Sequence, residues 1–311
     1  FERHGVALKI EDDGRMFPVS NSSQTIIDCF LQATQKLGIT VLTGQSVQSI
    51  FKKDNFWKIE TQSQNYIAEK LILATGSNPK VWEMLQTFGH AIVTPVPSLF
   101  TFNIKDSRIK ELPGVAAQVA VKVKDTKLSS TGPLLITHWG MSGPAILKLS
   151  AWGARILHDK NYRFTIYVNW LNDLDKEDAE KTLKDLKQEH AKKAVSKKSP
   201  FDFPNRLWES LVLASGIEAE TKWADLSKIQ LQNLANQLTN GIFQVNGKST
   251  FKEEFVTAGG IDLKEINFKT MESKLHENLY FAGEIVNIDA VTGGFNFQNA
   301  WTSGFILANS L

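Results

Sequence analysis

Two short apolar segments that lie far apart in the chain end in the same way. Residues 71–76 read LILATG, and residues 279–284 read LYFAGE. A short apolar run that ends in small residues is typical of a buried strand in a parallel sheet, and ligands of open α/β sheets collect at the carboxyl ends of such strands. The pattern therefore predicts an α/β domain that is discontinuous in sequence.

The residues around the first of these segments support the α/β pattern. Alternation at 6–10 predicts a strand, residues 20–38 predict a helix with one apolar face, and ITVL at 39–42 predicts a short strand. Alternating runs that predict a three-stranded meander leading into LILATG lie at 46–53, 56–62 and 65–70.

The middle of the chain differs in character from both ends. Pro95 and Pro97 mark the change. Residues 94–172 are mainly strand-like, apart from a predicted helix at 143–157, and residues 173–250 are mainly helical and polar. We therefore expect an α/β domain built from residues 1–93 and 251–311, with residues 94–250 inserted into it.

The stretch VTGGFNFQNAWTSG, residues 291–304, places two adjacent glycines directly before a predicted helix. Gly293 and Gly294 are expected if the turn needs backbone angles that other residues avoid. They are also expected if an anionic or electron-rich group rests on the helix N-terminus, where unpaired N–H groups and the helix dipole favour negative charge. The stretch alone leaves both interpretations open.

The composition is that of an ordinary globular protein. Hydrophobic residues make up 42% and charged residues 22% of the 311 residues, and the formal net charge of +2 requires neither nucleic acid nor a membrane as a partner. Cys29 is the one cysteine, which excludes an internal disulfide, and its place on the apolar helix face favours a core role over a nucleophilic one. No apolar run has the length of a membrane span, and the six histidines lack metal-ligand spacing. We therefore expect a cytoplasmic protein without a metal site.

Taken together, these segments resemble the FAD-binding domain of the two-dinucleotide-binding flavoproteins. More narrowly, the chain resembles the BaiN/RdsA family of NAD(P)/FAD-dependent oxidoreductases, also called YhiN-like flavoproteins. The strings that carry the resemblance are GRMFPVSNSSQTIID at 14–28, THWGMSGPAILKLS at 137–150, FKEEFVTAGGI at 251–261, NFKTMESKLHENLYFAGE at 267–284 and DAVTGGFNFQNAWTSG at 289–304. The resemblance implies a discontinuous FAD-binding Rossmann-like α/β domain with an inserted β-rich plus helical domain.

The chain departs from the family pattern at two places. Family members open with a strand, a G-x-G-x-x-G turn and a helix that cradle the FAD pyrophosphate, and no G-x-G-x-x-G occurs in these 311 residues. We therefore expect that this N-terminal segment of the domain is absent from the sequence. Ser77 stands where the family commonly has a second glycine after ATG, so the usual contacts of that loop with flavin or substrate are not implied here.

The resemblance also implies which residues contact FAD. The backbone of residues 293–297 would lie along the pyrimidine end of the flavin, near its N1 and O2 atoms. Glu284 would accept a hydrogen bond from a ribityl hydroxyl, the alternative being a surface acid in a turn, and Val47 would offer backbone groups to the adenine. The complete set is Val47, Thr75, Gly76, Gly283, Glu284, Gly293, Gly294, Phe295, Asn296 and Phe297.

The string THWGMSGPA supplies two candidate catalytic residues, His138 and Ser142. A histidine donates a proton near neutral pH, and the resemblance places this string in the inserted domain, facing the flavin. The alternative for His138 is a hydrogen-bonded structural histidine. Arg15 and Phe17, in GRMFP, are expected on the substrate side, and the alternative is a turn followed by a core aromatic.

The resemblance implies reduction of an activated carbon–carbon double bond, with NAD(P)H as reductant and FAD as cofactor. Two substrate classes fit: a uracil in ribosomal RNA, which would have to be unstacked, and a small unsaturated molecule such as a steroid-type enone. Lysines at 192, 193, 197 and 198 favour the RNA, although such a run is usually a solvated helix end. A non-catalytic protein that has lost its cofactor is the third interpretation. The oligomeric state stays open.

Overall fold

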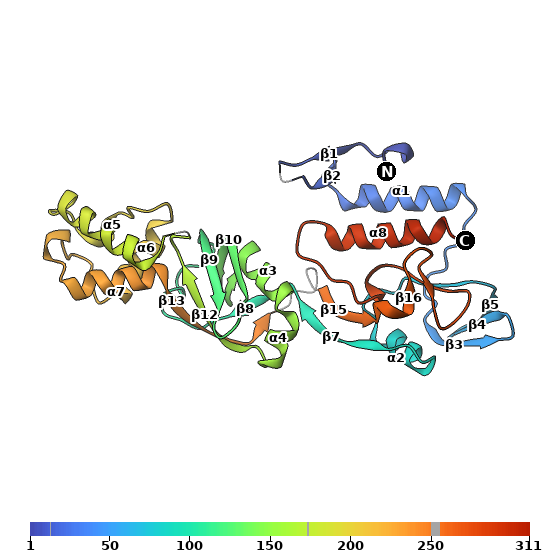
Figure 1. The fold of residues 1–311 in the computed structure, drawn as a ribbon. Helices are drawn as coiled ribbons and strands as arrows, with labels where there is room; N and C mark the ends of the chain where they lie inside the picture. Colours follow the sequence, from blue (N-terminus) through green and yellow to red (C-terminus); the bar gives the residue numbers. More distant parts are fainter. Residues whose placement is uncertain (13, 173, 250–255) are drawn as a thin grey trace. The chain divides into compact units, whose positions relative to one another are not determined.

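The computed structural model describes residues 1–12, 14–172, 174–249 and 256–311. The chain forms two compact units, and each is discontinuous in sequence (Figure 1). Unit 1 comprises Phe1–Ala91, Asp262–Ile285 and Gly293–Leu311, and unit 2 comprises Ile92–Ile261 and Val286–Thr292. The sequence predicted domain borders at 93/94 and 250/251, and the second of these lies outside the described residues.

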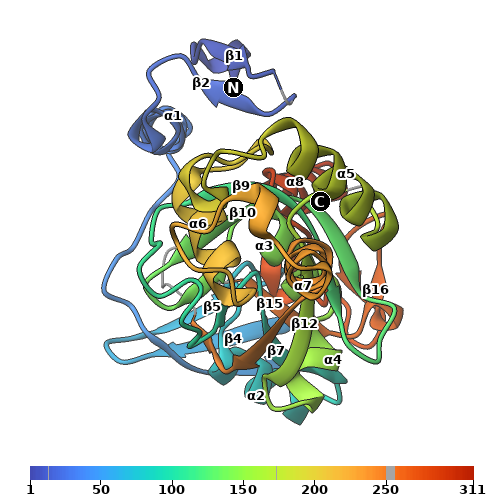
Figure 2. The same ribbon diagram turned by 90° about the vertical axis from the view of Figure 1, so that its left-hand side faces the viewer.

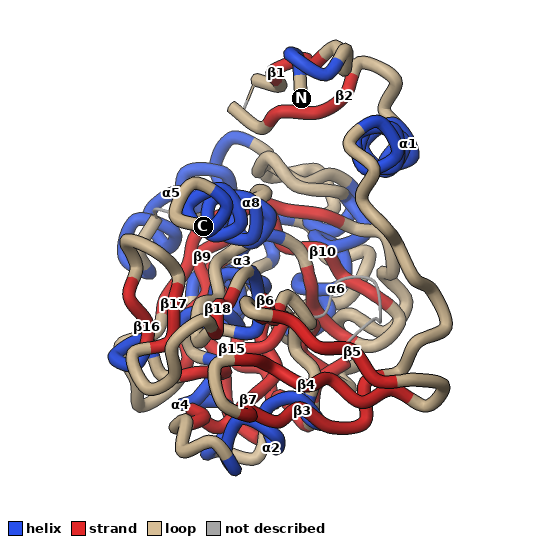
Figure 3. Tube along the Cα trace, turned by 90° about the vertical axis from the view of Figure 1, so that its right-hand side faces the viewer, coloured by secondary structure: helices blue, strands red, loops and turns tan. Residues whose placement is uncertain are grey.

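The two segments that end in glycine pair with each other in unit 1. Strand β6, Leu71–Leu73, runs parallel to β18, Leu279–Phe281, with all three residues of each strand paired. Two short antiparallel strands, β17 (Glu272–Ser273) and β16 (Ile266–Asn267), continue the sheet beyond β18, as Figure 3 shows. The parallel pair confirms the predicted α/β fold assembled from distant parts of the chain.

Strand β6 is less buried than predicted. Leu73 is buried, but Ile72 is 43% exposed, because β6 lies at the edge of the sheet and has β18 as its one neighbour among the described strands. The predicted strand at 39–42 is wrong, since these residues form no strand and the side chains of Ile39, Val41 and Leu42 are each more than half exposed. A strand requires a neighbour that pairs with its backbone, and none of the described strands runs beside this segment.

The other elements of unit 1 include the predicted hairpin, helix and meander. Helix α1 spans Ser23–Lys36 and is capped by the Ser22 side chain, which accepts a hydrogen bond from the Gln24 backbone N–H. Cys29 is buried, as expected of a core residue. The remaining elements are η1 (Glu2–His4), β1 (Leu8–Ile10), β2 (Met16–Pro18), β3 (Val47–Lys53), β4 (Phe56–Thr61), β5 (Asn65–Ala68), α2 (Pro79–Thr87), η4 (Leu263–Glu265), η5 (Gly283–Ile285) and α8 (Phe295–Ala308).

A seven-stranded antiparallel sheet forms the centre of unit 2, in the order β13-β12-β9-β10-β11-β8-β14. Burial alternates along its strands, as expected when one face of a sheet is covered and the other is not. The predicted helix at 143–157 forms but breaks at Gly153 into α3 and α4. The elements are β8 (Thr101–Asn103), β9 (Ala116–Val123), β10 (Ser129–Thr137), β11 (Gly140–Ser142), α3 (Pro144–Trp152), α4 (Ala154–Asp159), β12 (Arg163–Asn169), β13 (Gly241–Asn246) and β14 (Lys248–Ser249).

The helical part of unit 2 shares the core of this sheet. Helices α5 (Lys176–Glu189), α6 (Asn205–Ala214) and α7 (Lys228–Thr239) gather beside the sheet, as Figures 1 and 2 show. Their buried apolar side chains form one cluster with those of the strands. The other elements of unit 2 are η2 (Val195–Lys197), η3 (Trp223–Asp225) and an antiparallel ladder of β7 (Ile92–Ser98) with β15 (Val256–Ile261).

His90 is a buried side chain that ties three segments of unit 1 together. Its Nδ1 lies 2.8 Å from Glu265 Oε2, and its Nε2 lies 3.1 Å from Ser273 Oγ. Burial lowers the pKa of His90, and the hydrogen bond and charge of Glu265 offset that effect only in part. At neutral pH the contact with Glu265 is therefore a hydrogen bond of a neutral imidazole.

We expect the free energy of unfolding of unit 1 to fall as the pH drops below about 6.5, because the unfolded chain takes up a proton that folded His90 resists. Above that range the imidazole is neutral in both states and the effect vanishes. Denaturant unfolding at pH values from about 7.5 to 5.5 measures the dependence. His90→Gln should reduce the slope, and His4→Gln, at an exposed histidine of the same unit, should not. Equal slopes in all three proteins would contradict this assignment.

Candidate functional site

The carboxyl ends of β6 and β18 lie side by side because the two strands are parallel neighbours. The Ala282 backbone N–H donates to the Leu73 carbonyl at 3.1 Å, so the pairing continues up to the last residues before the predicted site. Residues 75–76 and 283–284 follow these strands after one alanine each. The structure thus brings together the two strand ends that the sequence analysis assigns to the cofactor.

Helix α8 packs against the end of β18. The Gly283 backbone N–H donates to Ser303 Oγ at 2.9 Å, and a Cβ added at Gly283 would lie 3.6 Å from Ala300 Cβ. Ala300 lies about one and a half turns, roughly 8 Å, beyond the first residue of α8. The opening of α8 therefore belongs to the same part of unit 1 as the two strand ends.

The opening of α8 has the backbone that a glycine turn provides. Gly293 has a φ of 126°, and Gly294, the N-cap residue, has a φ of 86° and caps the helix with no side chain. A Cβ added at Gly294 would meet no atom within 4 Å among the described residues, so the space around the N-cap is open. The positive φ values support the interpretation that the turn needs glycine backbone angles. The first-turn N–H groups and the helix dipole favour negative charge there, so an anionic group at this N-terminus stays a prediction.

Large apolar side chains surround this helix opening. Phe295 is 56% exposed and Phe297 is 67% exposed, and Asn296 between them is half-buried. The Phe297 ring lies 5.9 Å from that of Trp301, which in turn lies 5.0 Å from the ring of Phe1. Residues 293–297 thus combine polar backbone groups with flat apolar surface, which suits an aromatic ligand that carries hydrogen-bonding atoms.

Two buried polar atoms of this region have no hydrogen-bond partner among the described residues. They are Ser77 Oγ, in the loop after β6, and Asn299 Nδ2, in the second turn of α8. Buried polar atoms are nearly always paired in native proteins, so ordered water or a ligand with its own polar atoms would pair with both. Burial also raises the pKa of Glu284. The residues present therefore fit a polar aromatic cofactor such as a flavin.

The remaining predicted residues of unit 1 lie on other elements. Val47 begins β3, where it pairs with Thr61 and is 41% exposed. Arg15 and Phe17 belong to the β1–β2 hairpin, and the guanidinium carbon of Arg15 lies 5.4 Å from the centre of the Phe17 ring. Phe17 is 38% exposed, so it is not a core aromatic.

His138 and Ser142 belong to unit 2, unlike the residues around α8. His138 is exposed in the turn between β10 and β11, and Ser142 Oγ accepts a hydrogen bond from Thr101 Oγ1 at 3.0 Å. The glycines of the same string have a structural purpose. A Cβ added at Gly143 would lie 2.9 Å from the Leu135 backbone N, closer than real contacts allow. Close backbone packing therefore explains why this string contains glycine at position 143.

Asp289 is a candidate that the sequence analysis missed. Ser98 Oγ donates to Asp289 Oδ2 at 3.2 Å, and the side chain of Arg155, which donates to the Thr94 carbonyl at 3.0 Å, is the nearby positive charge. Burial raises the pKa of Asp289, while Ser98 and Arg155 lower it. The sequence hinted at this candidate only by placing an acid four residues before Gly293. The partners of Asp289, which are Ser98 and Arg155, lie more than a hundred residues away in the chain.

The lysine cluster surrounds η2 in unit 2. Lys197 Nζ lies 3.0 Å from Glu220 Oε1, and Lys193 Nζ lies 3.5 Å from His190 Nδ1. All four lysines of the cluster are exposed. Within the described ranges, no three His, Cys, Asp or Glu side chains gather as a metal site would require. No helix in the described part of the chain is both long and apolar enough to cross a bilayer.

Comparison with known families identifies the chain. The family described as "HI0933-like protein Rossmann domain" matches residues 1–310. The chain belongs to this family. The match confirms the Rossmann-like fold class and the resemblance drawn from the sequence strings.

Curated relatives agree with this assignment. The chain is 28% identical over 320 residues to the ribosomal RNA dihydrouridine synthase of Escherichia coli (strain K12). The aligned region covers 99% of this chain and 77% of the relative. The ribosomal RNA dihydrouridine synthase of Haemophilus influenzae (strain Rd) is 28% identical over 321 residues, with the same coverage. The 3-dehydro-bile acid delta(4,6)-reductase of Clostridium scindens is 21% identical over 304 residues, covering 94% and 74%. The chain is an enzyme of this flavin-dependent oxidoreductase family.

Proposed function

We propose that this protein binds FAD at the opening of α8 and uses NAD(P)H to reduce an activated carbon–carbon double bond. The observation that carries the proposal is the convergence, within unit 1, of the β6 and β18 ends with a glycine-opened helix. The two unpaired polar atoms there, Ser77 Oγ and Asn299 Nδ2, support it. FAD, when bound, supplies the chemistry of two-electron transfer between NAD(P)H and the substrate.

The chain's own residues would hold and tune this cofactor. The N–H groups that follow Gly294 stabilise negative charge at the pyrimidine end of the flavin. Glu284 accepts a hydrogen bond from a ribityl hydroxyl, and Phe295 and Phe297 exclude water from the ring edge. Reduction of the double bond consumes one hydride equivalent from NAD(P)H and one proton. His138 is the proposed donor of that proton, with Ser142 beside it in the same hairpin.

Ribosomal RNA is the substrate that we favour, with a uracil ring as the reduced group. The support is that two relatives named for this activity share 28% identity with the chain, against 21% for the bile acid reductase. The exposed lysine cluster of unit 2 offers positive charge for phosphates. Such an enzyme would act in the cytoplasm. A small steroid-type enone is the second candidate, supported by the bile acid reductase.

The substrate is tested by mass spectrometry of ribosomal RNA nucleosides from a strain that lacks the gene. We expect one dihydrouridine to disappear and to return when the full-length protein is supplied. Ribosomal RNA with an unchanged dihydrouridine content would contradict the RNA assignment. NAD(P)H oxidation by the purified full-length protein that depends on a steroid enone would then favour the second candidate.

Glu284→Gln should weaken FAD binding by roughly tenfold, because the variant replaces a charged hydrogen-bond acceptor with a neutral one. Flavin retained after gel filtration, together with titration of the stripped protein with FAD, measures the change. Glu83→Gln, at an exposed carboxyl of α2, is the matched control and should bind FAD as the wild type does. Equal affinity in all three proteins would remove Glu284 from the site.

A further inference from the structure

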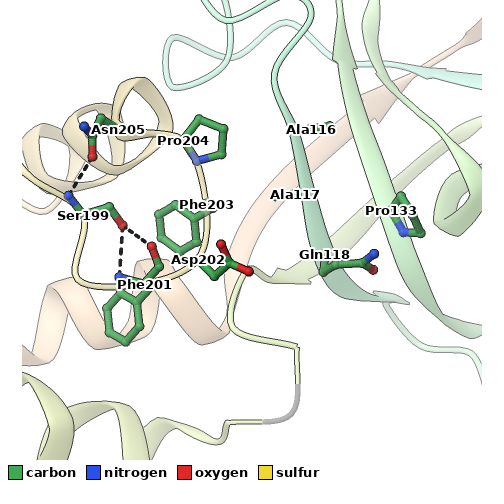
Figure 4. Close-up of a pocket in the computed structure, with 10 residues that line it drawn as sticks. All are labelled: Ala116, Ala117, Gln118, Pro133, Ser199, Phe201, Asp202, Phe203, Pro204 and Asn205. Atoms are coloured by element: carbon green, nitrogen blue, oxygen red, sulfur yellow. Dashed lines mark hydrogen bonds between the residues drawn. The ribbon is translucent and has the colours of Figure 1, made fainter.

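Unit 2 contains an open pocket that the proposed redox chemistry does not use. It has a volume of about 550 Å³ and lies between the loop 199–205 and strands β9 and β10 (Figure 4). This volume is within the range of about 300–1,000 Å³ that small-molecule sites occupy. The side chains that matter for its chemistry are Gln118, Pro133, Asp202, Phe203 and Asn205.

The loop that forms one wall is held in place by its own hydrogen bonds. The Ser199 backbone N–H donates to Asn205 Oδ1 at 2.8 Å, and Ser199 Oγ donates to the Phe201 carbonyl at 2.8 Å. The rings of Phe201 and Phe203 stack at 6.0 Å with an interplanar angle of 19°, and both contact buried Trp208. Phe203 is therefore a fixed aromatic wall, on which a planar ring is able to stack.

The polar side chains of the pocket are available to a ligand because no described protein group pairs with them. Neither the Asp202 carboxylate nor the Gln118 amide has a hydrogen bond or ion pair with any residue that the structure describes, and both side chains are exposed. Figure 4 shows the Asp202 carboxylate directed toward β9, whereas the Gln118 side chain extends from β9 away from Asp202. An ionised carboxylate only accepts hydrogen bonds, whereas an amide both donates and accepts. The pocket thus offers the two adjacent acceptor oxygens of Asp202.

Guanine has the edge that matches this arrangement. Its N1–H and N2–H groups are adjacent donors that match the two oxygens of one carboxylate. Adenine, cytosine and uracil do not present two adjacent donors on one Watson–Crick edge. Single-stranded RNA is read in this way, by bases that are turned out, stacked on aromatic side chains and hydrogen-bonded along their edges.

Positive charge lies next to the pocket in the chain. Lys197 and Lys198 directly precede Ser199, and both are exposed. Lys197 also contacts Glu220, so Lys198 is the better candidate for a phosphate contact. A base in the pocket would place its backbone phosphate near this side of the loop, where lysine charge strengthens binding to any RNA sequence.

We propose that this pocket binds an unstacked guanine of single-stranded RNA and so positions the substrate for reduction elsewhere in the protein. The assignment rests on the proposed function, since it names how the same RNA substrate is recognised. In it, Asp202 selects the base, Phe203 supports it by stacking, and Lys198 adds affinity that does not depend on sequence.

The test is fluorescence anisotropy with the full-length protein and three labelled RNA pentamers, UUGUU, UUIUU and UUUUU, where I is inosine. Inosine lacks the N2 amino group of guanosine. We expect UUGUU to bind roughly tenfold more tightly than UUUUU, with UUIUU between them. Asp202→Asn should remove most of the preference for G, while Asp185→Asn, at an exposed acid of α5, should keep it. Lys198→Ala should weaken all three pentamers by a similar factor.

Equal binding of UUGUU and UUUUU, or an unchanged preference in Asp202→Asn, would overturn the proposal. Free GMP that binds as tightly as UUGUU would overturn it too, because the site would then serve a free nucleotide. These measurements need no NAD(P)H and no turnover. If UUGUU binds no better than UUUUU while dihydrouridine in ribosomal RNA still depends on the gene, the guanine pocket would be contradicted and the proposed function would stand. An unchanged dihydrouridine content in the deletion strain would contradict the proposed function, whatever affinities the pentamers have.

Discussion

Replacing Gly140 by alanine will lower the free energy of unfolding of unit 2 by more than about 4 kcal/mol, a loss that few single substitutions reach. Gly140 opens β11 with a φ of 147°, in a backbone region that favours glycine. An added Cβ would overlap the Phe102 carbonyl oxygen and lie 2.5 Å from the Ile104 backbone N. Phe102 is fully buried, so the backbone of β8 has no room to move away.

Gly114→Ala separates the two causes of this loss. Gly114 lies in the same unit with a φ of 86°, but an added Cβ there meets no described atom within 4 Å. We expect this control to lose only about 1–2 kcal/mol, the cost of a left-handed backbone at a residue with a side chain. Denaturant unfolding of both variants against the wild type gives the comparison. Similar losses in the two variants would show that the clash with β8 does not exist.

Replacing Gly294 by valine will remove most of the FAD from the purified full-length protein. A β-branched side chain does not tolerate the left-handed backbone of this N-cap, so the first turn of α8 must rearrange. The rearrangement moves the N–H groups that we propose face the flavin, and the valine side chain enters the open space around the N-cap. We expect the affinity for FAD to fall by at least about tenfold, in line with the loss of one or more charge-assisted hydrogen bonds.

The matched control for this variant is Gly304→Ala in the same helix. Gly304 has no positive φ, and an added Cβ meets no described atom within 4 Å. This variant should keep its FAD and gain up to about 1 kcal/mol of stability, because alanine is the better helix former. The ratio of flavin to protein absorbance measures retention in both variants. A Gly294→Val protein that keeps a full complement of FAD would place the flavin elsewhere.

The sequence predicted those parts of the fold that depend on local patterns of residues. LILATG and LYFAGE were predicted to belong to one α/β domain because each is a short apolar run followed by small residues, and β6 and β18 do pair. The helix over 20–38 was predicted from its caps and apolar face, which are local properties. The family match confirms the fold class that these strings implied.

What the sequence did not predict depends on distant neighbours. ITVL at 39–42 has the composition of a strand but lacks a pairing partner among the described strands. Ile72 is exposed because β6 is an edge strand, a property of the sheet and not of the segment. Asp289 was missed since its burial and its contact with Ser98 depend on residues far away in the chain. The cofactor and catalytic roles of the site residues stay predictions, Glu284 and His138 among them.

The measurement that tests the central claim most directly is the visible absorption spectrum of the full-length protein, with the bound chromophore identified after denaturation. The arrangement of β6, β18 and the opening of α8 predicts the bands of an oxidised flavin, released as FAD at about one per chain. Addition of NAD(P)H without oxygen should bleach those bands. A colourless protein that stays colourless after FAD is added would contradict the assignment of this site.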